Sequence, residues 1–191
     1  MKFSEYAYKR PVFEDVKEQQ LKLIAELGYA KSFEQAEKAF LDSEKLNRSV
    51  QTMGTLASIR FTLNTADEFY KAEQEFWDET SPLLMELGVK MSAALLASPF
   101  KADFEKKYGE MLIKNAELSV KSMTPELVPL MQEENRLSSE YSALTSSMSV
   151  TFQGEECNNY GLLKYMESKD ESDLNALCAV LYRPARSGIE S

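Results

Sequence analysis

Hydrophobic residues recur every three or four positions along most of the chain, the spacing that places side chains on one face of an α-helix. The first such series follows Pro11 and runs to Gly28, a residue type that often comes after the last helical turn. The second spans Phe33 to Leu63 and predicts a helix of about 30 residues, on the order of 45 Å long. Within it, Gly54 weakens the helix by roughly 1 kcal/mol relative to alanine without breaking it.

Two capping boxes and several prolines divide the remaining helical pattern. The sequences Ser32-Phe33-Glu34-Gln35 and Thr65-Ala66-Asp67-Glu68 each place Glu or Gln three residues after a hydroxyl, as helix N-termini do. The second box starts a helix that we expect Pro82 to kink or divide, because a mid-helix proline removes one backbone hydrogen bond. Three more helices are expected, from Ser98-Pro99 to Tyr108, from Glu110 to Met123, and from Thr124-Pro125 to about Ser146.

The pattern changes after these helices. Met148, Val150 and Phe152 alternate with polar residues, and Gln153-Gly154 follows as a turn. This alternation predicts a hairpin near residues 148–157, and a short helix is expected from Leu162 to Ser168. The expected fold is therefore mostly α, an antiparallel bundle of long helices with one small β-hairpin near residues 148–157.

Composition and charge narrow the class of protein. The 191 residues are 43% hydrophobic, enough for one domain with a sizeable core. Lys and Arg total 22 against 31 Asp and Glu, a net charge of −9, which argues against binding nucleic acid or an anionic membrane. The N-terminus has no apolar signal-peptide core, and charged residues interrupt the longest apolar-rich stretch, Leu83 to Leu96. A cytoplasmic protein is expected.

The chain contains no histidine. This excludes serine or cysteine triads with a histidine base, histidine-ligated zinc and Glu-x-x-His di-iron bundles. Cys157 and Cys178 have neither CxxC nor zinc-ribbon spacing, so we interpret them as two reduced thiols. The residues alone therefore predict no catalytic residue and no metal ligand in this chain, and they leave the substrate-binding residues unknown.

Acidic clusters are the remaining candidates for acid–base or hard-metal chemistry. They comprise Glu73, Glu75, Asp78 and Glu79, the pair Glu133-Glu134 and the pair Glu155-Glu156. Acid–base catalysis needs two carboxyls in different environments that face one cavity. Adjacent residues on a helix point about 100° apart, so a helical pair does not easily share a site. We interpret all of these residues as parts of solvent-exposed faces.

Aromatic residues and one arginine are the other unusual features. Phe69, Tyr70, Phe76 and Trp77 form a stripe that we interpret as core or helix–helix packing rather than a ligand site. Arg60 lies on a mostly apolar helix. We expect it to pair with a carboxylate of a neighbouring helix, and a binding role is the alternative.

The segment from Met53 to Tyr70, which reads MGTLASIRFTLNTADEFY, resembles the N-terminal region of oligoendopeptidase F-type enzymes. These enzymes belong to the thimet oligopeptidase family of zinc metallopeptidases. Further stretches match in the same order, at residues 3–11, 73–82, 132–141 and, in the expected hairpin, 150–156. The resemblance covers about Met1 to Lys169.

The resemblance implies a mostly helical, clam-like fold whose N-terminal part covers a deep channel. Members of the family are much longer chains that cut short peptides at a zinc held by a His-Glu-x-x-His helix and a further Glu. This chain has no such motif, so the resemblance implies a lid-like portion with zinc only in the full-length family. Residues 1–170 are expected to form this domain. Its implied partners are short peptides or a missing catalytic domain.

Residues 171–191 diverge from the family. Leu174 to Tyr182 is almost continuously apolar where relatives continue with a charged helix. One hypothesis is a frameshift near Glu171 that gives a truncated product, and the other is a short buried helix with a tail. The function expected is thus that of a truncated N-terminal region of a zinc-dependent oligopeptidase, inactive alone. The alternative is a helical peptide- or protein-binding scaffold with no enzymatic role.

Overall fold

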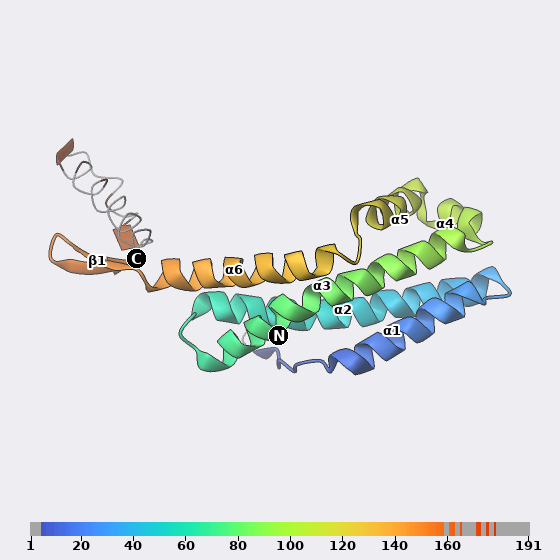
Figure 1. Cartoon of the computed structure of the whole chain (residues 1–191), viewed down its shortest axis with the longest axis horizontal. Coiled ribbons are helices and arrows are strands. Elements are labelled where there is room, and N and C mark those ends of the chain that lie inside the picture. Colours follow the sequence, from blue (N-terminus) through green and yellow to red (C-terminus); the bar gives the residue numbers. More distant parts are fainter. Residues whose placement is uncertain are drawn as a thin grey trace. The chain divides into compact units, whose positions relative to one another are not determined.

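Six helices and one two-stranded sheet form within the residues that the computed structural model describes, which are 5–158, 161–162, 165, 171–172, 175 and 178. The helices are α1 (Phe13–Gly28), α2 (Phe33–Leu63), α3 (Glu68–Ala97), α4 (Lys101–Tyr108), α5 (Glu110–Ser122) and α6 (Leu127–Ser147). The strands are β1 (Ser149–Phe152) and β2 (Glu155–Asn158). This order confirms the predicted mostly α fold with a small hairpin (Figure 1).

The chain divides into two compact units, Met1–Ser139 and Glu140–Ser191. In the first unit, α1, α2 and α3 pack against one another along their lengths, and α4 and α5 pack at the C-terminal end of α3 (Figure 1). The expected boundary between residues 1–170 and 171–191 stays a prediction. Within the described residues, no single helix is long and apolar enough to span a membrane; α3 and α4 pass that test only as a pair bent by 106°.

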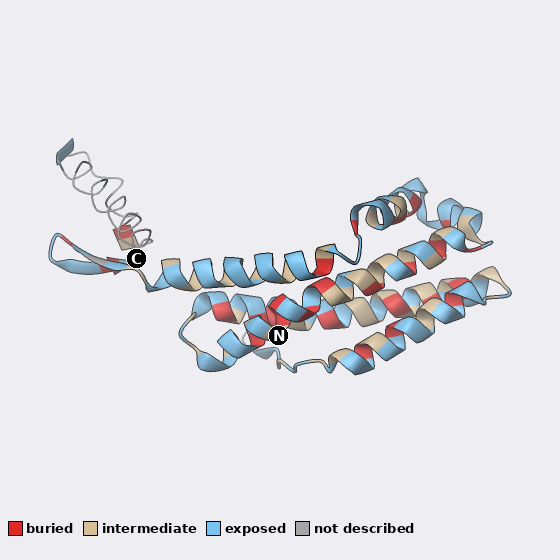
Figure 2. Ribbon diagram, viewed as in Figure 1, coloured by how far each residue is buried: buried red, intermediate tan, exposed pale blue. Residues whose placement is uncertain are grey.

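Buried residues recur along α1, α2 and α3, whereas α6 is mostly exposed (Figure 2). One cluster surrounds Phe104, whose ring meets those of Phe33 and Phe40 edge-on at 5.1 and 5.5 Å between centroids. A second surrounds Trp77, and a third joins Leu27 of α1 to α2 and α3. The helical periodicity of the sequence therefore has its physical counterpart in these apolar clusters between the helices.

Local hydrogen bonds explain where α2 and α3 begin. The Ser32 hydroxyl accepts a hydrogen bond from the Gln35 N–H at 3.3 Å, which confirms the first predicted cap. The cap of α3 is Asp67, not Thr65 as the second capping box predicted. The Asp67 carboxylate accepts hydrogen bonds from the backbone N–H groups of Phe69 and Tyr70 at 3.0 and 3.1 Å, so the helix begins two residues later.

The proline inside α3 does not divide it. The helix runs without a break for 30 residues through Pro82, so of the two expected outcomes, a kink or a division, the division is wrong. The Pro82 side chain is fully buried, so packing offsets the one lost backbone hydrogen bond. By contrast, Gly109 ends α4 as predicted, with a φ of 88° that glycine adopts without strain.

The hairpin lies where the alternating pattern placed it. The strands pair antiparallel, with Val150 opposite Cys157. Gln153 and Gly154 both have positive φ, 51° and 84°, as a two-residue turn that matches strand twist requires. Phe152, Cys157 and Leu162 form a small core within the second unit. The expected helix from Leu162 to Ser168 and the apolar run from Leu174 to Tyr182 lie mostly outside the described residues.

Candidate ligand-binding groove

A groove of about 700 Å³ lies between α2 and α3, with α5 at one end. We call it the α2–α3 groove. Its volume falls within the range typical of small-molecule and cofactor sites, about 300–1,000 Å³. Apolar side chains line part of it, including Met85, Met91 and Leu95, and polar side chains line the rest.

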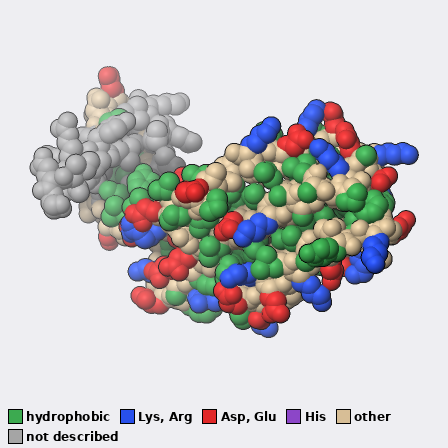
Figure 3. Space-filling model, turned by 45° about the vertical axis from the view of Figure 1, so that its right-hand side comes forward, with side chains coloured by type: hydrophobic (Ala, Val, Ile, Leu, Met, Phe, Trp, Pro, Cys, Tyr) green, Lys and Arg blue, Asp and Glu red, His purple; other side chains and the backbone are tan. Residues whose placement is uncertain are grey.

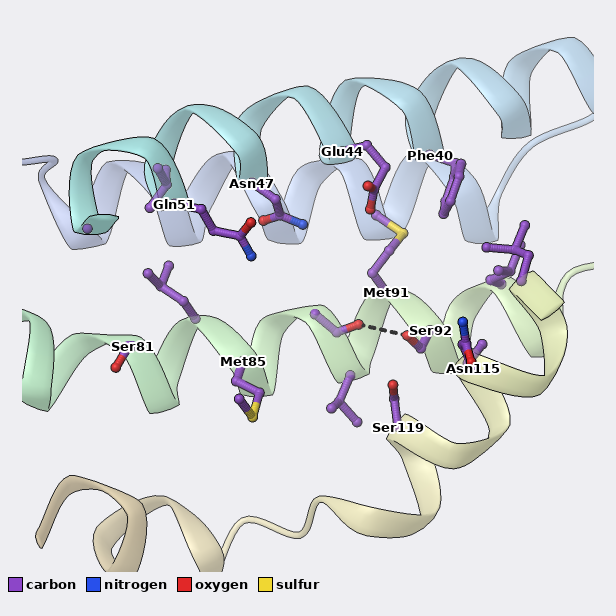
Figure 4. Close-up of a pocket in the computed structure, with 18 of the residues that line it drawn as sticks. Phe40, Glu44, Asn47, Gln51, Ser81, Met85, Met91, Ser92, Asn115 and Ser119 are labelled. Carbon is purple, nitrogen blue, oxygen red and sulfur yellow. Dashed lines mark hydrogen bonds between the residues drawn. The ribbon is translucent and has the colours of Figure 1, made fainter. Parts of the chain in front are cut away.

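The polar residues of the groove come from three helices. Glu44, Asn47, Gln51 and Thr55 are spaced by three and four along one face of α2. Figure 4 shows Glu44, Asn47 and Gln51 projecting from α2 into the space between α2 and α3. Ser81 and Ser92 of α3 and Asn115 and Ser119 of α5 complete the polar lining. The lining is therefore rich in groups that both donate and accept hydrogen bonds.

A second cavity of about 380 Å³ adjoins the groove and shares Gly54, Thr55, Trp77 and Ser81 with it. We call it the Asp78 pocket. Gln74, Trp77, Asp78 and Ser81 line it at helical spacing from one face of α3, and Ser58 and Asn135 line it from α2 and α6. The Asn135 amide donates hydrogen bonds to the Asp78 carbonyl at 3.0 Å and to the Ser81 hydroxyl at 3.3 Å.

Asp78 is a buried carboxylate without a cationic partner among the described residues. Its exposed fraction is 7%, and the Gln74 amide donates to its Oδ1 at 2.8 Å. Burial raises the pKa of Asp78 above its usual range; hydrogen bonds from Ser139 and Gln74 oppose this rise, and the charges of Glu75 and Glu79 add to it. The expectation that Asp78 belongs to a solvent-exposed face is therefore wrong.

Glu73 is also buried, with an exposed fraction of 4%, so the same expectation is wrong for it. The Arg10 guanidinium donates to both Glu73 oxygens at 2.8 Å, and the Tyr8 hydroxyl donates to Oε2. Burial alone raises a carboxyl pKa, but the hydrogen bonds from Arg10 and Tyr8 hold the pKa of Glu73 below its ordinary value. Burial and the bond to Glu73 raise the pKa of Tyr8 to about 12.

The remaining acidic candidates lie on the surface, as expected. Glu75, Glu79, Glu133, Glu134, Glu155 and Glu156 are all exposed. Of the aromatic stripe, Trp77 is buried in the core, Phe76 is partly buried against the same cluster, and Phe69 is exposed. The stripe is thus core only at its C-terminal end.

Arg60 does not pair with a carboxylate of the described residues, so that expectation is wrong. Its guanidinium donates to the Tyr70 hydroxyl at 2.7 Å and to the Tyr6 carbonyl, and it lies over the Tyr70 ring at 5.5 Å. A phenol and a carbonyl thus replace the expected anion. Arg60 ties the chain before α1 to α2 and α3.

The described residues do not fit a zinc ion. No three His, Cys, Asp or Glu side chains come together among them. Cys157 is buried and Cys178 exposed, and neither forms a disulfide. A catalytic zinc needs three protein ligands, and this part of the chain does not bring three together.

Sequence reasoning missed the groove residues Glu44, Asn47 and Gln51. The available signal was their spacing of three and four on α2, which sets them on one face beside the apolar positions. The pattern does not reveal which helix this face meets. The groove exists because α3 and α5 lie opposite it.

Comparison with known protein families identifies the class of this chain. The family model described as the Peptidase M3 N-terminal domain matches residues 3–123. The chain therefore belongs to the Peptidase M3 N-terminal domain family. A comparison with curated proteins finds no significant match.

Solved structures give the same result over more of the chain. An oligoendopeptidase F from Bacillus anthracis is 35% identical, with a TM-score of 0.95 over 100% of this chain and 35% of its own. PZ peptidase A with an inhibitor is 35% identical, with a TM-score of 0.89 over 93% of this chain and 32% of its own. Another oligoendopeptidase F structure is 36% identical, with a TM-score of 0.91 over 94% of this chain and 32% of its own. The chain thus spans about a third of the length of these relatives.

Proposed function

We propose that this chain is the helical N-terminal part of a zinc-dependent oligopeptidase and that it helps to hold short peptides without cutting them itself. The match to oligoendopeptidase F at a TM-score of 0.95 and 35% identity over the whole chain carries this proposal. Zinc and the groups that activate water are assigned to the part of the relatives that lies beyond the match, in keeping with the lack of histidine in this chain.

Complementation tests the proposal. The chain is purified and mixed with the separately expressed remaining two-thirds of an oligoendopeptidase F relative, and cleavage of an internally quenched peptide is followed. Neither part alone should cleave the peptide, and the mixture should cleave it in a zinc-dependent way. The matched control replaces the chain with an unrelated helical protein of similar size and charge.

Cleavage by the chain alone, abolished by substitution of one of its own residues, would contradict the proposal. Failure of the mixture to cleave, with both parts shown to be folded, would also count against it. The alternative function is a helical peptide-binding module with no enzymatic partner. The α2–α3 groove favours this alternative, because all of its lining residues lie within the first unit.

A further inference from the structure

The charged residues that line the groove and the adjoining pocket are all acidic. Among the described residues, no lysine or arginine lines either the α2–α3 groove or the Asp78 pocket, whereas each has one carboxylate, Glu44 and Asp78. Elsewhere on the molecule basic residues are plentiful, and Figure 3 shows Lys and Arg interspersed with Asp and Glu over the visible face of the described residues. The lack of cations is therefore a property of the lining and not of the surface as a whole.

Three amide side chains of the groove are also without partners among the described residues. Within the described residues, the side chains of Asn47, Gln51 and Asn115 make no hydrogen bond to another residue, although all three line the groove. Figure 4 shows them directed toward the space between the helices. Each amide offers one acceptor and two donor hydrogens, the set that a peptide main chain matches with its C=O and N–H groups.

We propose that the α2–α3 groove and the Asp78 pocket together bind a short extended peptide and that the pocket takes an arginine side chain of that peptide. The ligand class, a peptide, rests on the proposed function. The place of binding and the preference for arginine rest on the lining residues described above.

An arginine side chain suits the Asp78 pocket because hydrogen-bond acceptors of the pocket come from two helices. Asp78 lines it on α3, hydroxyls of Thr55 and Ser58 line it on α2, and Ser81 completes the set. A guanidinium has five N–H donors in a rigid plane and stacks on aromatic rings, and Trp77 lines the same pocket. The bound cation would also supply the counter-charge that Asp78 lacks among the described residues.

The groove matches a peptide in length. Its lining residues on α2 run from Phe40 to Thr55, about 22 Å at 1.5 Å per residue. An extended chain advances about 3.3 Å per residue, so about seven residues fit and a hexapeptide lies within the groove's length. Methionines at positions 85 and 91 adapt to side chains of different shape, which favours tolerance outside the arginine position.

The chain carries its own reporter for the test. Trp77 is the only tryptophan in the sequence, and it lines both the groove and the pocket. We would titrate the full chain at fixed ionic strength with a capped hexapeptide of alanines that contains one arginine. The matched ligand replaces arginine with citrulline, which has nearly the same shape and no charge. The arginine peptide should change Trp77 emission and release heat in calorimetry, and the citrulline peptide should bind at least tenfold more weakly.

Two variants separate the pocket from general electrostatics. Asp78→Asn should weaken binding of the arginine peptide at least tenfold, to the level of the citrulline peptide. Glu79→Gln makes the same change in net charge one residue away, at an exposed position that lines neither cavity, and should change affinity less than twofold. The double variant Asn47→Ala/Gln51→Ala should weaken both peptides by the same factor. Circular dichroism of each variant checks that the helices are intact.

Equal binding of the two peptides, or full binding by Asp78→Asn, would overturn the arginine pocket. No change in emission or heat up to millimolar peptide would overturn the site as a whole. These results are independent of complementation, because they measure binding to this chain alone. If complementation fails while the arginine peptide binds, the enzymatic proposal fails and the site stands.

Discussion

Glu73 and Asp78 are both buried on α3, yet their surroundings drive their pKa values in opposite directions. Glu73 meets a guanidinium and a phenol, which stabilise its charged form. Asp78 receives hydrogen bonds only from neutral groups, which do not offset the loss of hydration. Sequence spacing does not distinguish the two acids, but the side chains opposite them do.

Asp78→Asn should raise the free energy of unfolding at pH 7 by about 1 kcal/mol, because the uncompensated charge is removed and its shape is kept. Because the pKa of Asp78 is raised in the folded state, its charged form destabilises the native state at pH values above the ordinary Asp pKa of about 3.9. Protonation of Asp78 removes this destabilisation as the pH falls. The gain should therefore shrink toward pH 3. Urea denaturation at several pH values measures it, with Glu79→Gln as control, and a loss of stability at pH 7 would contradict the argument.

Arg10→Met should lower the free energy of unfolding by about 2 kcal/mol at pH 7, because it leaves the Glu73 carboxylate buried beside Tyr8 alone. Because the pKa of Glu73 is lowered in the folded state, its ionisation stabilises the native state at pH values above the ordinary Glu pKa. This stabilisation is lost as the pH falls through the lowered pKa, so the difference between Arg10→Met and wild type should disappear in acid. Lys38→Met removes an exposed ion pair with Asp42, which water screens, and should leave the free energy of unfolding almost unchanged. Equal effects of the two substitutions in urea denaturation would refute the assigned role of Arg10.

Two mid-helix glycines differ in what surrounds them. A Cβ added to Gly54 of α2 would lie 3.2 Å from Cε3 of Trp77, whereas one added to Gly88 of α3 would meet nothing within 4 Å. The glycine of α2 therefore lets the indole approach the helix backbone. The glycine of α3 lines the groove and has no such packing role.

Gly88→Ala should stabilise the chain by about 1 kcal/mol through helix propensity and reduced freedom of the unfolded chain. Gly54→Ala gains the same propensity but crowds Trp77, so it should give no net stabilisation, and Gly54→Leu should destabilise by about 2 kcal/mol. Thermal unfolding followed by circular dichroism compares the three variants. Similar stabilisation by both alanines would show that Trp77 does not pack as described.

The periodicity of the sequence predicts α1, α2 and α3 well because each of these helices buries one face along its length. The 31 residues of α2 follow from spacing alone, and so does the end of α4 at Gly109. The failures have local causes that the pattern does not contain. Pro82 stays inside α3 because its ring is buried, and Asp67 replaces Thr65 as the cap because its carboxylate reaches two N–H groups.

At the scale of the whole molecule, the candidate site depends on how the helices pair, which one sequence does not specify. Glu44 and Asp78 lie on different helices and line two adjoining cavities, which form because α2 and α3 lie side by side. The family resemblance could be predicted from the order of several segments, and it is confirmed over residues 3–123. The acidic lining could not be predicted, because exposed and buried acids look alike in the sequence.

Exposed apolar residues predict how the chain behaves alone. On α2, Leu56 is buried, whereas Ile59 and Leu63 are exposed. A longer stripe follows one face of α6 at spacings of seven, four and three. It consists of Leu130, Leu137, Tyr141 and Leu144, exposed by 65%, 49%, 68% and 61%. Such rows favour association, because typical monomers expose only patches of a few hundred Å².

The chain should therefore self-associate and bind a hydrophobic dye as its concentration rises. Leu137→Lys should reduce both effects while leaving the helical circular dichroism unchanged, because the side chain is exposed and the apolar row is interrupted at its middle. Glu134→Gln makes the same change in net charge at another exposed position of α6 and should leave association as it is. Sedimentation velocity and dye fluorescence, measured on the same samples, compare the three proteins. A wild-type chain that stays monomeric and binds no dye at high concentration would show that this stripe does not drive association. Equal effects of the two substitutions would show that the change in charge, and not the loss of apolar surface, reduces association.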